Sequence, residues 1–214
     1  MTLRTAALIL LAILPACRKP EPTRPEVAKP LQPEIVQPVA KKPIIAESAQ
    51  VASLIDPVKL ATLRKRGANT RILKITAILW SAKSTGKNPA EITQQAVKKI
   101  GWGDTDKGEL TAAAILRNLT IAEELGATTP DDIIEMRKGQ SPIVRKGPST
   151  GDILSVDHII PRSVAPELDN VIANLELLPL KLNQSKGDTI GPRQRSLARQ
   201  LHAAGLLENL GIVR

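Results

Sequence analysis

The sequence contains no phenylalanine and no tyrosine, and Trp80 and Trp102 are its only aromatic residues. A protein that binds single-stranded nucleic acid by stacking bases needs several aromatic faces, so this class is excluded. One cysteine and two histidines also exclude a disulfide framework and an ordinary structural zinc site. Since 42% of the residues are hydrophobic, a core can still form, but it must consist of leucine, isoleucine, valine and alanine.

Positive charge is in excess. The 214 residues include 30 lysines and arginines against 21 aspartates and glutamates, which gives a formal net charge of +9. Such a charge raises non-specific affinity for polyanions, including nucleic acids and anionic membranes, but it does not specify a fold. The length suits one domain, or one domain with a tail.

The N-terminus has the pattern of an export signal. Arg4 precedes an apolar run over residues 5–16, TAALILLAILPA, which is shorter than the roughly 20 residues of a membrane-spanning helix but suits a signal peptide. The run ends in Leu14-Pro15-Ala16-Cys17, which resembles a bacterial lipobox. The resemblance implies a signal peptide over residues 1–17, lipidation of Cys17, and a lipid anchor in the cell envelope, on its periplasmic side. A plain secretory signal and an uncleaved apolar N-terminus are the alternatives.

Residues 18–52 are predicted to form a tether. Seven of the 17 prolines lie between Pro20 and Pro43, and proline removes a backbone donor and fixes φ, so neither a helix nor a central strand is expected. Such a stretch favours extended polyproline II, a semi-rigid spacer that would hold a folded domain away from a membrane. A disordered tail without function has the same composition.

Residues 53–145 are predicted to form a helical subdomain. Capping side chains followed by a proline or an acidic residue indicate four helix starts: Asp56-Pro57, Asn88-Pro89, Asp106 with Glu109, and Thr129-Pro130 with Asp132. Helix ends are expected at four glycines: Gly67, Gly86, Gly101 and Gly126. A basic run, residues 64–66 with Arg71 and Lys74, either grips phosphates or forms a solvated face.

Residues 146–214 are predicted to add a small β part, so the expected fold class is α+β. Apolar alternation favours strands over 153–159 and 174–178, joined by turn-forming residues, and 179–186 suits a short helix. A basic terminal helix follows over 192–204. The order is strand, loop, strand, helix, after the helical subdomain.

Residues with catalytic chemistry gather in this unit. Asp157 and Asn183 offer oxygen ligands, which Mg²⁺ or Mn²⁺ prefers, and two such ligands leave positions open for water and a phosphate oxygen. His158 follows Asp157, and neighbours in a strand point to opposite sides. One residue can therefore bind metal while the other acts as general base on water. Lys186 adds positive charge where the transition state gains negative charge.

The residues of this unit resemble a known motif. Asp157-His158-Ile159-Ile160-Pro161, then Asn174-Leu175, then NQSKGD over 183–188 resembles the HNH endonucleases, whose fold is the ββα-metal, or His-Me, finger. The resemblance is confined to residues 151–188 and makes the chain an HNN variant, with Asn183 as the last letter.

The resemblance assigns a role to each matched residue. It implies that His158 activates water, that Asp157 and Asn183 hold one divalent metal, that Asn174 braces the loop behind the histidine, and that Lys186 lies near the scissile phosphate. Many members carry two Cys-x-x-Cys pairs that bind a structural zinc. This chain has a single cysteine, so no structural zinc is expected and the helical subdomain must brace the finger instead.

The predicted function is a metal-dependent endonuclease that hydrolyses phosphodiester bonds, in DNA in preference to RNA. Four arginines are expected to contact the nucleic acid: Arg162, Arg193, Arg195 and Arg199. For the last three, which lie in the basic helix, a solvated face is the alternative. The alternative function is an inactive envelope lipoprotein that binds nucleic acid or another partner through an HNH-like fold. The sequence identifies no protein partner.

Overall fold

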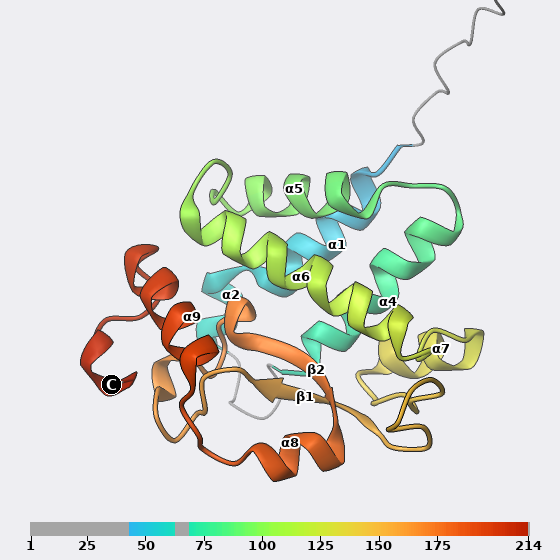
Figure 1. Ribbon diagram of the computed structural model, residues 1–214. Helices are drawn as coiled ribbons and strands as arrows, with labels where there is room; N and C mark the ends of the chain where they lie inside the picture. The colour runs from blue at the N-terminus through green and yellow to red at the C-terminus, as the bar shows by residue number, and fades with distance from the viewer. Residues whose placement is uncertain (1–42, 63–68, 214) are drawn as a thin grey trace, which may run out of the picture. The chain divides into compact units, whose positions relative to one another are not determined.

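The structure is a computed structural model and describes residues 43–62 and 69–213 of the chain (Figure 1). The predicted signal peptide, Cys17 and the tether up to residue 42 lie outside the described residues, as do Gly67 and the basic residues 64–66. Within the described ranges, no helix is both long enough and apolar enough to cross a membrane.

Helices make up most of the fold, and the α+β class is confirmed. In chain order the elements are α1 (Ile45–Ile55), α2 (Pro57–Thr62), α4 (Arg71–Ser84), α5 (Pro89–Lys99), α6 (Asp106–Glu124), α7 (Pro130–Lys138), β1 (Leu154–His158), β2 (Leu175–Pro179), α8 (Leu180–Lys186) and α9 (Pro192–Ala203). Short 3-10 turns occur at Pro166–Leu168, Ile172–Asn174 and Leu210–Val213.

Helix α1 corrects the predicted start of the folded part. It begins at Ile45, inside the predicted tether of residues 18–52, and it buries Val51 and Ile55 while packing on α4 and α5. No proline lies between Pro43 and Pro57, so this segment keeps its backbone donors and can be helical. The tether prediction is therefore wrong for residues 45–52.

Capping side chains begin the helices as predicted, with one exception. Asp56, Asn88 and Thr129 each accept a hydrogen bond from a backbone N–H in the first turn of the helix that follows. At α6 the cap is Thr105 and not Asp106, because Thr105 has the extended backbone of an N-cap (φ −124°, ψ 150°) and Asp106 is already helical. The predicted helix-ending glycines that the structure describes all have positive φ: Gly86, Gly101 and Gly126.

One core joins the helices to the strands. Buried apolar side chains of α1, α4, α5, α6 and α7 form a cluster that also contains Leu154 of β1 and Leu175 and Leu177 of β2. All the described residues fall in one compact unit, so the boundary predicted between residues 145 and 146 does not divide independent domains. A smaller cluster packs the loop after β1 against α9.

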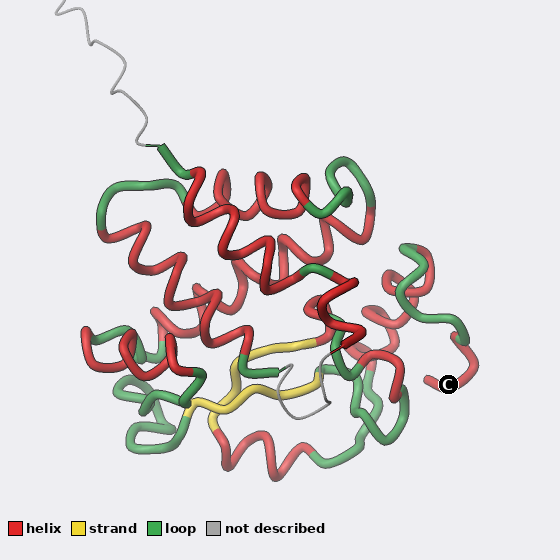
Figure 2. Tube along the Cα trace, turned by 180° about the vertical axis from the view of Figure 1, so that it is seen from behind, coloured by secondary structure: helices red, strands yellow, loops and turns green. Residues whose placement is uncertain are grey.

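Within the part of the chain that the structure describes, β1 and β2 form a two-stranded antiparallel sheet, as predicted. The register pairs Asp157 with Glu176 and His158 with Leu175. Helix α6 lies on one side of this hairpin and α8 on the other; Figure 2 shows the hairpin in yellow between them, seen from behind. The hairpin thus lies between a helix that precedes it in the sequence and a helix that follows it.

Asn118 joins α6 to β2. Its side chain is fully buried, its Oδ1 accepts from Leu177 N at 2.6 Å, and its Nδ2 donates to Leu175 O at 3.0 Å. The amide satisfies a backbone donor and a backbone acceptor on the outer edge of β2. The helical part supports the hairpin through this contact.

Arg71 is buried and does not belong to a solvated or phosphate-gripping face. It is 4% exposed, and its guanidinium donates to Leu54 O at 2.8 Å and to Asn170 O at 3.1 Å. Burial lowers the pKa of Arg71 to about 10. Arg71 therefore links the end of α1 to the loop before β2.

Candidate functional site

One face of the hairpin carries a row of polar side chains. Ser155 and Asp157 are two residues apart on β1, so their side chains share a face of the strand. Antiparallel pairing sets Glu176 of β2 directly opposite Asp157. Asp157 is 8% exposed and Glu176 is 4% exposed. Two buried carboxylates side by side need positive partners, because an unpaired buried charge is costly.

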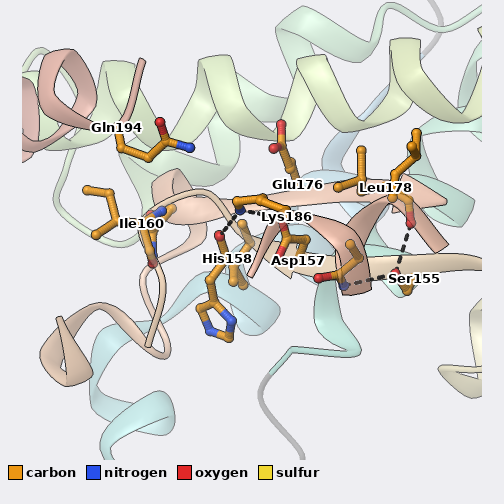
Figure 3. A network of polar contacts seen from close by, with 12 residues as sticks. Ser155, Asp157, His158, Ile160, Glu176, Leu178, Lys186 and Gln194 are labelled. Carbon is orange, nitrogen blue, oxygen red and sulfur yellow. Dashed lines mark hydrogen bonds and ion pairs between the residues drawn. The ribbon is translucent and has the colours of Figure 1, made fainter. Parts of the chain in front are cut away.

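Lys186, at the end of α8, is the partner of Asp157. Its Nζ lies 2.5 Å from Asp157 Oδ2 and donates a second hydrogen bond, also of 2.5 Å, to the carbonyl oxygen of His158 (Figure 3). Charge-assisted hydrogen bonds of this kind are stronger than neutral ones. Lys186 therefore neutralises Asp157 and ties α8 to the end of β1.

Arg193, in the first turn of α9, is the partner of Glu176. The guanidinium forms a two-pronged contact, with Nη1 donating to Glu176 Oε1 at 2.9 Å and Nη2 donating to Oε2. The hydrogen bond to Glu176 raises the pKa of Arg193; burial opposes this, and the charges of Glu176 and Asp157 add to it. Arg193, predicted to contact nucleic acid, thus lies within the field of both carboxylates.

Asn183 of α8 lies over the same face. Its Nδ2 donates to Ser155 Oγ at 3.1 Å, and Ser155 Oγ donates to Leu178 O at 2.8 Å. Ser155 is two residues before Asp157 and lies on the same side of β1. Asn183 therefore lies on the face of the hairpin that carries Asp157. Among the hydrogen bonds of the described residues, none uses the amide oxygen of Asn183, so this oxygen is free to act as a ligand.

Asn174 holds the chain after His158. It is fully buried, its Oδ1 accepts from Ile160 N at 2.8 Å, and its Nδ2 donates to Ile160 O at 3.0 Å. Its carbonyl oxygen also accepts from Ile159 N at 2.8 Å. These contacts fix the two residues that follow His158, and this is the geometry required of a bracing asparagine.

The His158 ring lies away from the Asp157–Lys186 pair, as strand alternation predicts (Figure 3). Its Nε2 is 3.1 Å from Asp169 O and 3.2 Å from Asp169 Oδ1. A proton on Nε2 satisfies the carbonyl oxygen and leaves the lone pair of Nδ1 to accept a proton from water. In this tautomer Nε2 is the donor and Nδ1 the acceptor.

Asp169 is a buried carboxylate behind this ring. It is 4% exposed, and in the described ranges neither of its carboxylate oxygens receives a hydrogen bond. The nearest cationic side chain is Arg162, whose Nη1 is 4.0 Å from Asp169 Oδ1. The negative charge of Asp169 therefore faces His158, where it would stabilise an imidazolium formed during proton transfer.

The four arginines predicted to contact nucleic acid have different surroundings. Arg162 and Arg193 are exposed residues that also reach the carboxylates of the site. Arg195 donates to the carbonyl oxygen of Ile190 at 3.1 Å, so it stabilises the start of α9. Arg199 is exposed farther along α9. The structure brings Arg162 and Arg193 to the site, whereas Arg195 has a local structural contact.

The donor set fits a hard divalent cation. Searching the described residues finds no group of three or more histidine, cysteine, aspartate and glutamate side chains that could hold a metal. Asp157 and Asn183 nevertheless offer a carboxylate and an amide oxygen on one face, which suits Mg²⁺ or Mn²⁺ with water as further ligand. The ammonium of Lys186 occupies one oxygen of Asp157, Oδ2, so a metal ion would have to share this carboxylate with it.

Glu176 and Asp169 are site residues that the sequence reasoning missed. Glu176 could have been found by pairing the two predicted strands, because that register sets it opposite Asp157. Asp169 stands in a loop and was interpreted only as a turn residue, since nothing in its sequence neighbours indicates contact with His158 eleven residues earlier.

Comparisons with known proteins give no family: no family model, no curated protein and no solved structure matches this chain. The function must therefore be argued from the site itself. Its distinguishing features are a carboxylate bound by an ammonium on one side of β1, an imidazole on the other side, and a braced turn between the strands.

Proposed function

We propose that the protein is a metal-dependent HNH-type endonuclease that hydrolyses phosphodiester bonds in nucleic acid, DNA in preference to RNA. In this proposal β1, β2 and α8 form the ββα-metal finger, and the helical part supports it in place of a structural zinc. The proposal also includes export of the protein to the cell envelope, where a lipid on Cys17 would anchor it to the membrane.

The observation that supports this function best is the opposition of Asp157 and His158 at the end of β1. Asp157 points toward α8 and its cationic partner, while His158 points away and is held through Nε2. A metal ligand and a general base that serve one phosphate must reach it from different directions. Adjacent residues of a strand point to opposite sides, so they meet this requirement. The bracing by Asn174 keeps the strand end in that conformation.

Each residue then has a defined task. Asp157 and Asn183 would hold the divalent ion, which when bound supplies Lewis-acid stabilisation of the phosphate charge. His158 accepts a proton from water at Nδ1, and Asp169 fixes the ring and stabilises its charged form. Lys186 supplies positive charge next to Asp157.

One observation favours a second candidate, a nucleic-acid-binding protein without hydrolytic activity. Both carboxylates of the row are already paired, Asp157 with Lys186 and Glu176 with Arg193. A site that is neutral without a metal ion can persist as a folded scaffold, so catalysis has to be tested directly.

Nicking of a supercoiled plasmid by the full-length protein tests the proposal. Activity is expected with Mg²⁺ or Mn²⁺ and is expected to disappear in excess EDTA. His158→Ala should lower the rate by roughly 10²–10⁴, the usual contribution of a general base, while His202→Ala serves as the matched control. His202 is the second histidine of the chain and contacts Leu207 O outside the site.

Two results would contradict the proposal. Cleavage that persists in EDTA would exclude the metal, and cleavage by His158→Ala at the rate of His202→Ala would exclude the general base. If the wild-type protein binds DNA but never nicks it, the second candidate is supported instead.

A further inference from the structure

A second group of positive side chains lies beside the site, between α6 and α9. A cavity of about 330 Å³ is lined by Arg117, Ile159, Arg193, Ser196, Leu197 and Gln200. Three of these residues, Arg193, Ser196 and Gln200, are exposed, so the cavity opens at the surface. Its polar lining consists of donors: two guanidiniums, a hydroxyl and an amide.

Arg117 has unused hydrogen-bonding capacity. Its Nη2 donates to Leu175 O at 3.2 Å, whereas its Nε is buried and has no partner among the residues that the structure describes. Burial lowers the pKa of Arg117; the charge of Glu176 opposes this shift, and the charge of Arg193 adds to it. Desolvation of a charged guanidinium that is only partly compensated favours an added anion.

The charges of the cavity do not balance. Lys186 neutralises Asp157, so among the described residues Glu176 is the carboxylate that Arg117 and Arg193 share, and two guanidiniums face a single negative charge. Arg193 uses two of its N–H groups on Glu176, and a guanidinium has five. An excess of one positive charge therefore remains, with donors to spare.

The cavity lies on the same face as the candidate metal ligand. Arg193, which lines the cavity, binds Glu176, and Glu176 is paired with Asp157 across the sheet, so these two carboxylates share a face. Each strand of a DNA duplex carries one phosphate per about 3.4 Å of helix axis. Because Asp157 contacts Lys186 and does not line the cavity, the cavity would meet a phosphate next to the one that Asp157 faces in the proposed function.

We propose that the cavity between α6 and α9 binds a phosphate group of the nucleic-acid backbone that flanks the scissile phosphate. Arg117 and Arg193 bind its charge, and Ser196 and Gln200 contribute neutral hydrogen bonds. This inference rests on the proposed function, because only a nuclease has a scissile phosphate. Nucleic-acid binding at the cavity can nevertheless be measured without cleavage.

The experiment measures binding of a fluorescein-labelled DNA duplex to the full-length protein by anisotropy, in EDTA and over a series of salt concentrations. Arg117→Gln removes one charge, and Ser196→Asp introduces a negative charge at an exposed position of α9. Arg137→Gln on α7 and Ser84→Asp on α4 are exposed control variants with the same charge changes outside the cavity.

Arg117→Gln and Ser196→Asp should each weaken binding by about tenfold, and Arg117→Gln should lower the salt slope of the binding constant by about one. The controls should bind as the wild type does. If circular dichroism shows that Arg117→Gln is not folded, the binding of DNA by Ser196→Asp decides whether the cavity binds phosphate. Unchanged binding by the cavity variants, equal weakening by the controls, or no DNA binding by the wild type would each overturn the proposal.

Cleavage in Mg²⁺ separates this proposal from the proposed function. Cleavage that depends on His158 but is accompanied by unchanged DNA binding in both cavity variants overturns the phosphate site and leaves the endonuclease standing. If the wild-type protein never cleaves DNA but both cavity variants bind it more weakly, the phosphate site is supported and the proposed endonuclease activity is rejected.

Discussion

At the scale of the residue, the carboxylate of Asp157 is both the partner of Lys186 and the proposed ligand of a divalent ion. The ammonium lies 2.5 Å from Asp157 Oδ2, and Asp157 is 8% exposed, so little water screens this contact. A cation that binds Asp157 must displace or repel the ammonium. In the proposed function, the charge of Lys186 would therefore weaken metal binding in the free protein while helping the transition state.

Lys186→Gln is expected to tighten Mn²⁺ binding by about tenfold, which corresponds to about 1.4 kcal/mol. The reason is that the buried carboxylate loses its cationic partner and its competitor for the metal at once. Electron paramagnetic resonance of Mn²⁺, without nucleic acid, gives the affinity. Lys181→Gln, on an exposed position of the same helix, is the control. Equal or weaker Mn²⁺ binding by Lys186→Gln would mean that the ammonium does not compete.

At the scale of the element, α6 and β2 depend on each other through Asn118. Removing its amide leaves the buried Leu177 N without a partner among the described residues, while Leu175 O keeps the hydrogen bond from Arg117 Nη2. A buried polar group left unsatisfied costs about 1–3 kcal/mol. Asn118→Ala should therefore lower the free energy of unfolding by about 3 kcal/mol, measured by urea denaturation.

The control for this variant is Thr120→Ala, an exposed position on the same helix, which should change the free energy of unfolding by less than about 0.5 kcal/mol. If Asn118→Ala were as stable as Thr120→Ala, water or a shift of the backbone would be supplying the hydrogen bonds of the β2 backbone. The Asn118 amide would then not be the link between α6 and the hairpin.

Helix α7 depends on a carboxylate at its start. Burial raises the pKa of Asp132, but hydrogen bonds from Arg145 and Thr129 and the charge of Arg145 outweigh it, so the pKa is lowered from its ordinary value of 3.8. The folded state therefore favours the ionised form. This stabilisation is present above the ordinary pKa and is lost as the pH falls through the lowered one.

Asp132→Asn should lower the free energy of unfolding by about 1–2 kcal/mol at neutral pH, since the cap and the Arg145 ion pair weaken together. The difference from wild type should shrink as the pH falls from about 4 toward the lowered pKa. Urea denaturation over this pH range gives both values. Asp131→Asn, the exposed neighbour, should show a smaller difference. A difference that grows in acid would contradict the assignment.

At the scale of the whole molecule, local chemistry made the helices and the hairpin predictable. Caps such as Asn88 and Thr129 act on backbone within three residues, and the strands follow from alternation over five. The start of α1 was not predictable from proline content, because the helix is held by packing on α4 and α5. The proline-rich composition ends at Pro43, so it has no bearing on the helix that begins at Ile45.

The candidate site divides in the same way. Asp157, His158 and Lys186 could be named from a motif, whereas Asp169, Glu176 and Arg117 join the site through strand register and through contacts between distant segments. Arg117 is the clearest case, because it comes from a helix that the sequence assigned only a supporting part. Long-range packing therefore adds the charges that the motif leaves out.

The occupied edge of β2 also affects how the protein behaves among copies of itself. A strand whose backbone groups are unpaired is a template on which another chain can add a strand, and such edges promote aggregation and domain swapping. Because Asn118 holds Leu177 N and Leu175 O, β2 offers no template at these positions. A single side chain thus limits the growth of the sheet in this direction, which protects a molecule whose only sheet in the described ranges has two strands.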